Sequence, residues 1–125
     1  MKPEILKFDP STEFFIEEGC YITENSSSDN DPDLSIAQAR VPVGVTTRWH
    51  RLHGTIERYV IISGKGRMEV GDLPPREMTA GDTVIIPPMV RQRITNIGDD
   101  DLIFFALCSP RFKQEVYEDI EEQES

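Results

Sequence analysis

Glycine and proline interrupt this chain so often that the segments between them are too short for long helices. The chain has nine prolines and eight glycines, and turn signals recur roughly every 8 to 12 residues. Between them lie short β-branched and aromatic runs: LSIAQARV, TTRWHRL, ERYVIIS, RMEV, TVIIP, QRITN and DLIFFALC. Short strands at regular spacing predict an all-β sandwich or barrel. No helical pattern alternates with them, so a parallel α/β sheet is not expected.

Size and charge narrow the possible functions. The chain has 125 residues, which is enough for one domain. Its net charge is −10, and six of its 23 acids lie in residues 115–125, which leaves 17 acids against 13 bases, or −4, elsewhere. Nucleic-acid binding is disfavoured because it needs a basic face. No apolar run reaches the length of a membrane span, and the N-terminus lacks the apolar core of a signal peptide, so a cytoplasmic location is expected.

The two histidines lie together, beside a carboxylate. His50, His53 and Glu57 fall within eight residues, and imidazole with carboxylate is a ligand combination typical of Zn, Fe, Mn or Ni. Their spacing would also fit one face of a helix, but the flanking TTRW and YVII runs favour strands. The sequence therefore predicts two strands joined by a tight turn near 53–55.

Alternation along these two strands assigns side chains to faces. On the first strand, Arg48 shares a face with His50, whereas His53 points away unless a bulge turns it inward. On the second strand, Glu57 and Tyr59 share a face. We expect this strand to be covered on both sides, because its other face is also apolar.

Two further residues on these faces have alternative interpretations. Tyr59 is either a hydrogen-bond donor to a bound oxyanion or a core aromatic. Arg48 is either a clamp for a substrate carboxylate or phosphate or the charge partner of Glu57. Glu57 itself is a metal ligand, a general base or an ion-pair partner, because an inward carboxylate needs one of these partners.

With the strands placed, the spacing resembles the cupin family. Its first motif is matched by Gly44, His50, Glu57 and Gly64, and its second by Gly81, Pro87 and Asn96. Two ordered motifs are more specific than either alone. The resemblance implies a double-stranded β-helix, or jelly-roll barrel, over residues 34–110. A strand-rich arm, 1–33, would precede the barrel, and a short acidic tail, 111–125, would follow it.

The departures from the family pattern lie at its metal-binding positions. The second histidine position falls on Leu52 or on His53, depending on the spacing to Glu57. The motif-two histidine is replaced by Gln92, whose amide oxygen is a weaker ligand. The resemblance thus implies a divalent ion, Zn, Fe, Mn or Ni, bound by His50, His53, Glu57 and Gln92.

Two hypotheses of function follow. The first is a metal-dependent isomerase, decarboxylase, lyase or dioxygenase that acts on a small carboxylate- or sugar-derived molecule, with Glu57, Tyr59 and Arg48 as catalytic residues. The alternative is a metal-free cupin that binds a small ligand or serves as an interaction module. In either case we expect a homodimer, because a small barrel with apolar outer surfaces often buries an edge against a second copy.

Overall fold

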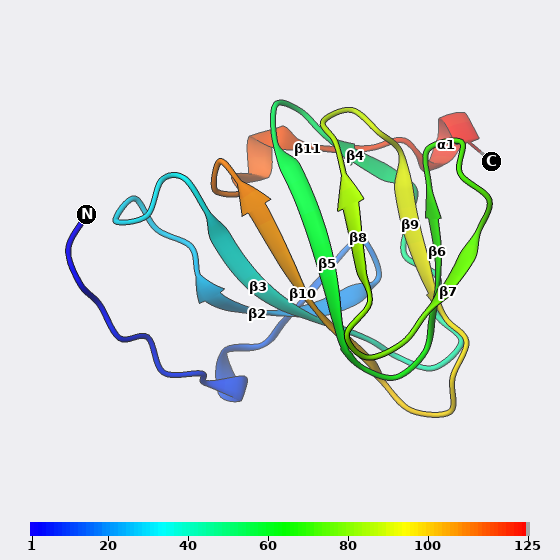
Figure 1. Cartoon of the computed structure of the whole chain (residues 1–125), viewed down its shortest axis with the longest axis horizontal. Helices are drawn as coiled ribbons and strands as arrows, with labels where there is room; N and C mark the ends of the chain where they lie inside the picture. Colours follow the sequence, from blue (N-terminus) through cyan, green and yellow to red (C-terminus); the bar gives the residue numbers. More distant parts are fainter. Residues whose placement is uncertain (125) are drawn as a thin grey trace.

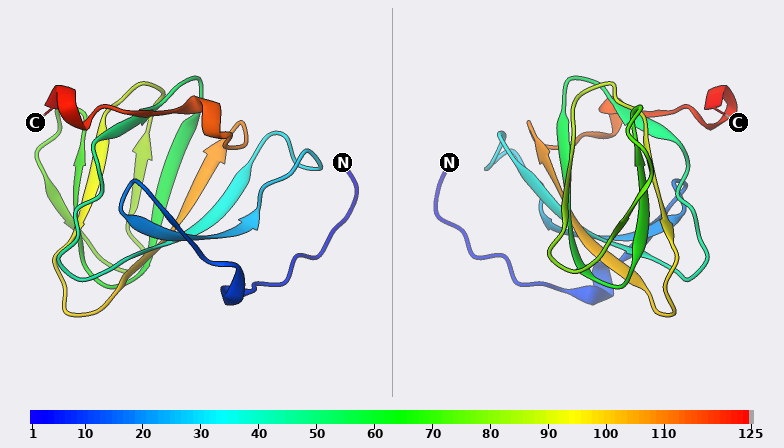
Figure 2. Two further views of the ribbon diagram at one scale, coloured as in Figure 1. Left: turned by 180° about the vertical axis from the view of Figure 1, so that it is seen from behind. Right: turned by 45° about the vertical axis from the view of Figure 1, so that its right-hand side comes forward.

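Two antiparallel sheets face each other across a single core in the computed structural model, which describes residues 1–124 (Figures 1 and 2). The first sheet has the order β1 (Phe14–Ile16), β2 (Cys20–Ser26), β3 (Ser35–Val41), β10 (Leu102–Ser109), β5 (Ile56–Ser63) and β8 (Thr83–Ile86). The second has the order β11 (Tyr117–Asp119), β4 (His50–Leu52), β9 (Gln92–Asn96), β6 (Gly66–Val70) and β7 (Arg76–Met78). Short helical turns occur at η1 (Pro10–Thr12), η2 (Gln114–Val116) and α1 (Glu121–Glu124). The predicted all-β jelly-roll barrel is confirmed.

Inward side chains from the two sheets form the core. Phe104, Ile61 and Ile86 of the first sheet and Ile94 of the second are almost fully buried. Burial alternates along β9 and through the first six residues of β5, as the period-2 pattern requires. Glu57 and Tyr59 both point inward, as predicted for their shared face.

The two strands that carry the histidine cluster do not form a hairpin. β4 belongs to the second sheet and β5 to the first, so the turn at 53–55 leads from one sheet to the other. His50 and Glu57 therefore approach each other across the barrel interior, which corrects the expectation that they lie on neighbouring strands. β4 is also shorter than expected, because it begins only at His50.

Asn96 explains why both family motifs are needed for this geometry. Its side-chain nitrogen donates to the carbonyl oxygens of Val41 and Asp100, both at 2.8 Å. Its backbone carbonyl accepts from the nitrogen of Gly44 at 3.2 Å. Together, the side-chain and backbone hydrogen bonds of this buried residue connect the loop before β4 to the end of β9.

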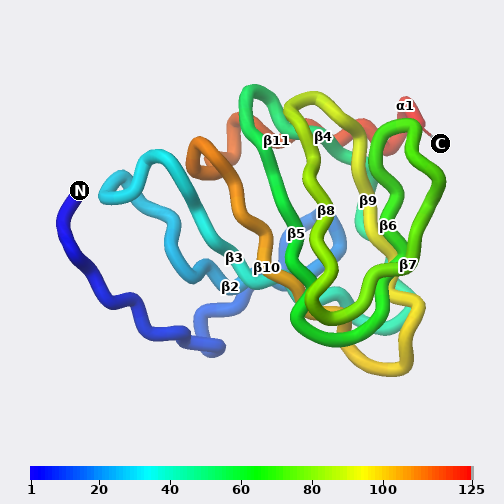
Figure 3. Tube along the Cα trace, viewed as in Figure 1, coloured from blue at the N-terminus to red at the C-terminus, as the bar shows by residue number. Residues whose placement is uncertain are grey.

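Both ends of the chain contribute to the sheets. The strand-rich arm supplies β1 and β2, and the acidic tail supplies β11, which pairs with β4. The tail is held further by the nitrogen of buried Ile120, which donates to the carbonyl of Trp49 at 3.0 Å. The first residues, before η1, extend away from the barrel (Figure 3). Among residues 1–124, no helix is long and apolar enough to cross a membrane.

We predict that Gly64→Ala destabilises the fold more than Gly81→Ala. Both glycines have positive φ, 89° and 92°, so alanine is strained at either site by about 1–2 kcal/mol. At Gly64 the added Cβ would also lie 2.7 Å from the carbonyl oxygen of Asp101, whereas at Gly81 it meets nothing within 4 Å. Urea unfolding of both variants measures the difference. Equal losses would show that the close approach at Gly64 has no energetic importance.

Candidate functional site

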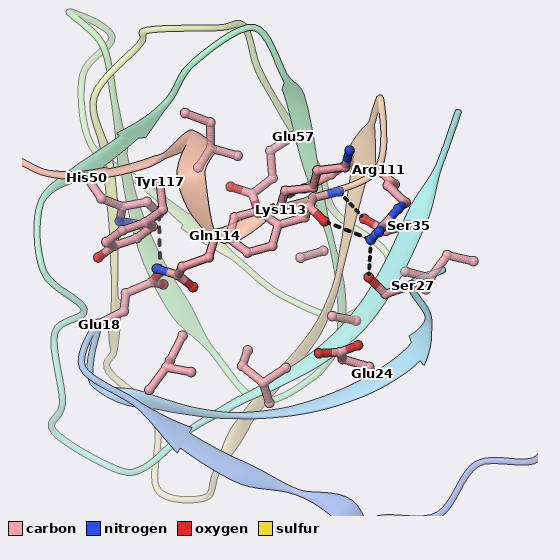
Figure 4. Close-up of a pocket in the computed structure, with 18 of the residues that line it drawn as sticks. Glu18, Glu24, Ser27, Ser35, His50, Glu57, Arg111, Lys113, Gln114 and Tyr117 are labelled. Carbon is pink, nitrogen blue, oxygen red and sulfur yellow. Dashed lines mark hydrogen bonds and ion pairs between the residues drawn. The ribbon is translucent and has the colours of Figure 1, made fainter. Parts of the chain in front are cut away.

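A cavity of about 950 Å³ opens between the sheets at one end of the barrel (Figure 4). Its floor includes His50 from β4 and Glu57 from β5. Strands β2, β3 and β10 line it as well, and two chain segments outside the cupin motifs add further residues. These segments are the turn between β1 and β2, which carries Glu18, and residues 111–117 after β10.

His50 presents one ring nitrogen to this cavity. The imidazole is 2% exposed, and its Nδ1 lies 2.8 Å from the carbonyl oxygen of Arg48. A carbonyl only accepts hydrogen bonds, so Nδ1 carries the proton and a neutral His50 has its lone pair on Nε2. That Nε2 lies 3.5 Å from Oε1 of Glu18. The ring of Tyr117 stacks on the imidazole at 5.2 Å between centroids, which fixes its plane.

Glu57 is a carboxyl group inside the barrel. Burial raises its pKa, and the nearby Glu18 acts in the same direction. The positive charge of a protonated His50 and hydrogen bonds from Gln92 and Cys108 oppose the shift without cancelling it. Gln92 Nε2 donates to one carboxyl oxygen at 2.8 Å, and Cys108 Sγ donates to the other at 3.6 Å. Glu57 is therefore more readily protonated than an exposed glutamate.

Tyr59 and Gln92 form a chain of hydrogen bonds to Glu57 on its side away from the cavity. The Tyr59 hydroxyl donates to Gln92 Oε1 at 2.6 Å, and neither residue lines the cavity. Tyr59 also packs its ring against Phe104 at 4.3 Å between centroids. In this arrangement the Tyr59 hydroxyl orients Gln92, which in turn orients Glu57.

Two predicted site residues lie elsewhere. Arg48 donates to Asp119 of β11 at 2.6 Å on the surface and does not line the cavity, so it is neither the clamp nor the charge partner of Glu57. His53 is half exposed and pairs with Glu118 at 2.8 Å, in a smaller cavity of about 200 Å³ on the outside. No bulge turns it inward, and it points away from His50 as strict alternation requires.

The four predicted metal ligands do not converge. His50 and Glu57 line one cavity, His53 lies outside it, and the oxygen of Gln92 accepts from Tyr59 while its nitrogen faces Glu57. Across residues 1–124, no three His, Cys, Asp or Glu side chains are placed to hold one ion. The residues present therefore do not fit the divalent ion that the resemblance implies.

Sequence reasoning missed the residues that complete the cavity. Glu18, Tyr117, Arg111 and Lys113 all lie outside the motif-bearing segment, in the regions expected to be an arm and a tail. A local signal for Glu18 exists, since a glycine with φ 108° follows it and marks a tight turn. Nothing in the sequence shows that this turn faces His50.

The structure is a double-stranded β-helix with a cavity at one end, and small-molecule sites often lie in the mouth of such a barrel. A family model described as the cupin domain matches residues 37–108. A protein of Methanocaldococcus jannaschii is 37% identical over 87 residues, which cover 70% of this chain and 69% of that protein. The chain belongs to the cupin family, as the motif spacing predicted.

Solved structures with the same fold are more distant in sequence. KdgF from Halomonas sp. has a TM-score of 0.72 at 19% identity, covering 84% of this chain and 94% of that one. Pac13 of Streptomyces, described as a unique nucleoside dehydratase, has a TM-score of 0.74 at 16% identity, with coverage of 92% and 90%. A predicted oxalate decarboxylase of Thermotoga maritima has a TM-score of 0.73 at 20% identity, with coverage of 84% and 99%. At these identities the likeness shows the fold.

We predict that Glu57→Gln stabilises the protein at neutral pH and not in acid. A raised pKa means that the folded state binds more protons, so wild-type stability falls as pH rises above the ordinary value for glutamate, about 4.3. Glutamine mimics the protonated acid and removes this loss. Thermal unfolding should show a Tm a few degrees higher at pH 7, with the gain vanishing near about pH 4. A variant less stable at pH 7 would contradict the assignment.

Proposed function

We propose that this cupin catalyses a metal-independent acid–base reaction on a small hydroxylated molecule. The observation that carries the proposal is the pairing, in one cavity, of His50, whose Nε2 lies beside Glu18, with Glu57, whose pKa is raised by burial. Two titratable groups in contrasting environments are the usual arrangement for a general base and a general acid. Among the reaction classes that the family resemblance suggested, this pair fits a lyase.

In the proposed elimination, His50 Nε2 removes a proton from a carbon of the substrate. The electrons of the broken C–H bond form a C=C bond, and the C–O bond to the neighbouring hydroxyl breaks. Protonated Glu57 gives its proton to the departing hydroxyl, which leaves as water. The carboxylate of Glu18, 3.5 Å from Nε2, stabilises the imidazolium that forms. His50 then releases the proton that it took from carbon to solvent, and Glu57 takes up a proton from solvent, so that both residues return to their initial states.

The relatives are consistent with this class of reaction. One cupin of similar fold is described as a nucleoside dehydratase, and variants of it have been solved with uridine. Dehydration of this kind requires one base and one acid in a cavity of small-molecule size, and both are present here.

We predict that wild-type protein exchanges carbon-bound hydrogen for deuterium, or removes water, from a substrate within a panel of uridine, D-glucose, D-glucuronate and D-glucose 6-phosphate in D₂O. Loss of the general base in His50→Gln should slow this reaction by roughly 10² to 10⁴-fold. His53→Gln is the matched control, because that imidazole lies outside the cavity. NMR and mass spectrometry measure both exchange and loss of water.

Three outcomes would contradict the proposal. Activity lost after dialysis against a chelator and restored by Zn, Mn, Fe(II) or Ni would establish the metal-dependent alternative. Unchanged activity in His50→Gln would remove the assigned base. Binding of panel members without any reaction would favour the metal-free binding barrel.

We further propose a cytoplasmic homodimer in which residues 1–9 of each copy lie on the outer face of the other copy's first sheet. In the single chain these residues expose Ile5 (90%), Leu6 (51%) and Phe8 (51%), and the outer sheet face exposes Ile62 (39%) and Ile85 (66%). Apolar side chains on a segment and on a nearby sheet face are both expected to be covered.

Sedimentation at micromolar concentration should show a dimer for the wild type and a monomer for the double variant Ile5→Asp, Phe8→Asp. Leu73→Asp is the control, because Leu73 is 68% exposed yet belongs to neither surface. A monomeric wild type would reject the dimer, and a dimeric double variant would reject the role of residues 1–9.

A further inference from the structure

The two cationic side chains of the cavity lie across it from His50 and Glu18. Arg111 and Lys113 follow β10 and line the same cavity as His50 and Glu18. Figure 4 shows His50 and Glu18 on one side, Arg111 and Lys113 on the other, and Glu57 between them. A ligand that spans the cavity would therefore meet a reactive end and a cationic end.

Arg111 is held in place by several hydrogen bonds, and a ligand anion can replace one of its partners, Asp29. Its Nη1 donates to Ser27 Oγ at 3.5 Å and to the carbonyl of Phe112 at 3.4 Å. Its Nε and Nη2 donate to Asp29 Oδ1 at 3.2 and 3.0 Å. The Asp29 side chain is 90% exposed, whereas that of Arg111 is only 20% exposed. An ion pair with so exposed a carboxylate is weak, generally below about 1 kcal/mol, so a ligand anion can replace it.

Lys113 adds a second positive charge beside Arg111. Within residues 1–124, its ammonium makes no side-chain hydrogen bond or ion pair, and its side chain lines both the main cavity and the smaller one. Because the ammonium of Lys113 is on a flexible side chain, it can contact an anion that Arg111 binds.

Several acidic residues also line the cavity, among many uncharged ones. They are Glu17, Glu18, Glu24, Asp29, Glu57 and Glu115. A second anionic group at the reactive end would face the carboxyl groups of Glu18 and Glu57, which is unfavourable where water is scarce. Hydroxyl groups, by contrast, can donate to these carboxylates.

We propose that Arg111 and Lys113 bind the anionic end of the ligand, so that the substrate class is a small polyhydroxylated molecule with a single carboxylate or phosphate at one end. The fork of Arg111 binds two oxygens of that group in place of Asp29. This inference rests on the proposed function, because it orients the hydroxylated part of the ligand towards His50. It also gives Arg111 the clamping role that the sequence had suggested for Arg48.

The test compares three probes that differ at one carbon: D-glucose, D-glucuronate and D-glucose 6-phosphate. NMR titration of full-length protein gives a Kd for each. At least one anionic probe should bind about tenfold more tightly than glucose, a difference of about 1.4 kcal/mol. Arg111→Met should abolish that preference while glucose binding persists, which also shows that the variant is folded. Asp29→Ala should strengthen anion binding, because it removes the competing carboxylate.

Arg76→Met is the matched control, because Arg76 is an exposed arginine on β7 that does not line the cavity. Preference for glucuronate or for glucose 6-phosphate tells a carboxylate ligand from a phosphate ligand. Equal binding of all three probes, no binding of either anionic probe, or a preference retained in Arg111→Met would each overturn the proposal. If His50→Gln loses the reaction but Arg111→Met keeps the anion preference, only the anion site is rejected. If the wild type prefers an anionic probe but no reaction occurs, only the proposed function is rejected.

Discussion

The buried carboxyl group of Glu57 is the constraint on which the interior of this barrel depends. A carboxyl in an apolar core is costly unless it is hydrogen-bonded or protonated. Here Gln92 reaches it from the opposite sheet and Cys108 from the neighbouring strand, and Tyr59 holds Gln92 in place. These polar contacts join the two sheets at the point where their apolar side chains also pack. The packed core therefore holds the site residues in position.

The motif residues were predictable from their resemblance to the cupin motifs, and the structure gives a physical reason for two of them. Gly64 passes too close to Asp101 for any side chain, and Asn96 makes several hydrogen bonds that a hydrophobic residue could not make. Period-2 burial placed Glu57 and Tyr59 on the inner face. Alternation failed at Arg48 because β4 begins only at His50, so the strand geometry assumed for Arg48 does not exist.

The remaining site residues depend on tertiary structure that no local pattern encodes. Glu18 reaches His50 because the β1–β2 hairpin joins the first sheet, and Tyr117 does so because β11 pairs with β4. The acidic tail was expected only to follow the barrel, yet its Glu118 pairs with Arg51 on β4 and its Asp119 pairs with Arg48 just before β4. Each of these exposed ion pairs contributes little to stability. Together they favour pairing of the acidic tail with the edge of the second sheet at β4.

Residues 111–117 separate the ligand cavity from the core of the barrel. Phe104 and Ile94 lie on β10 and β9 and are buried in the core, whereas Arg111, Lys113 and Tyr117 follow β10 and line the cavity. Substitutions in this segment can therefore change which ligand the cavity accepts while the core packing of the barrel stays the same.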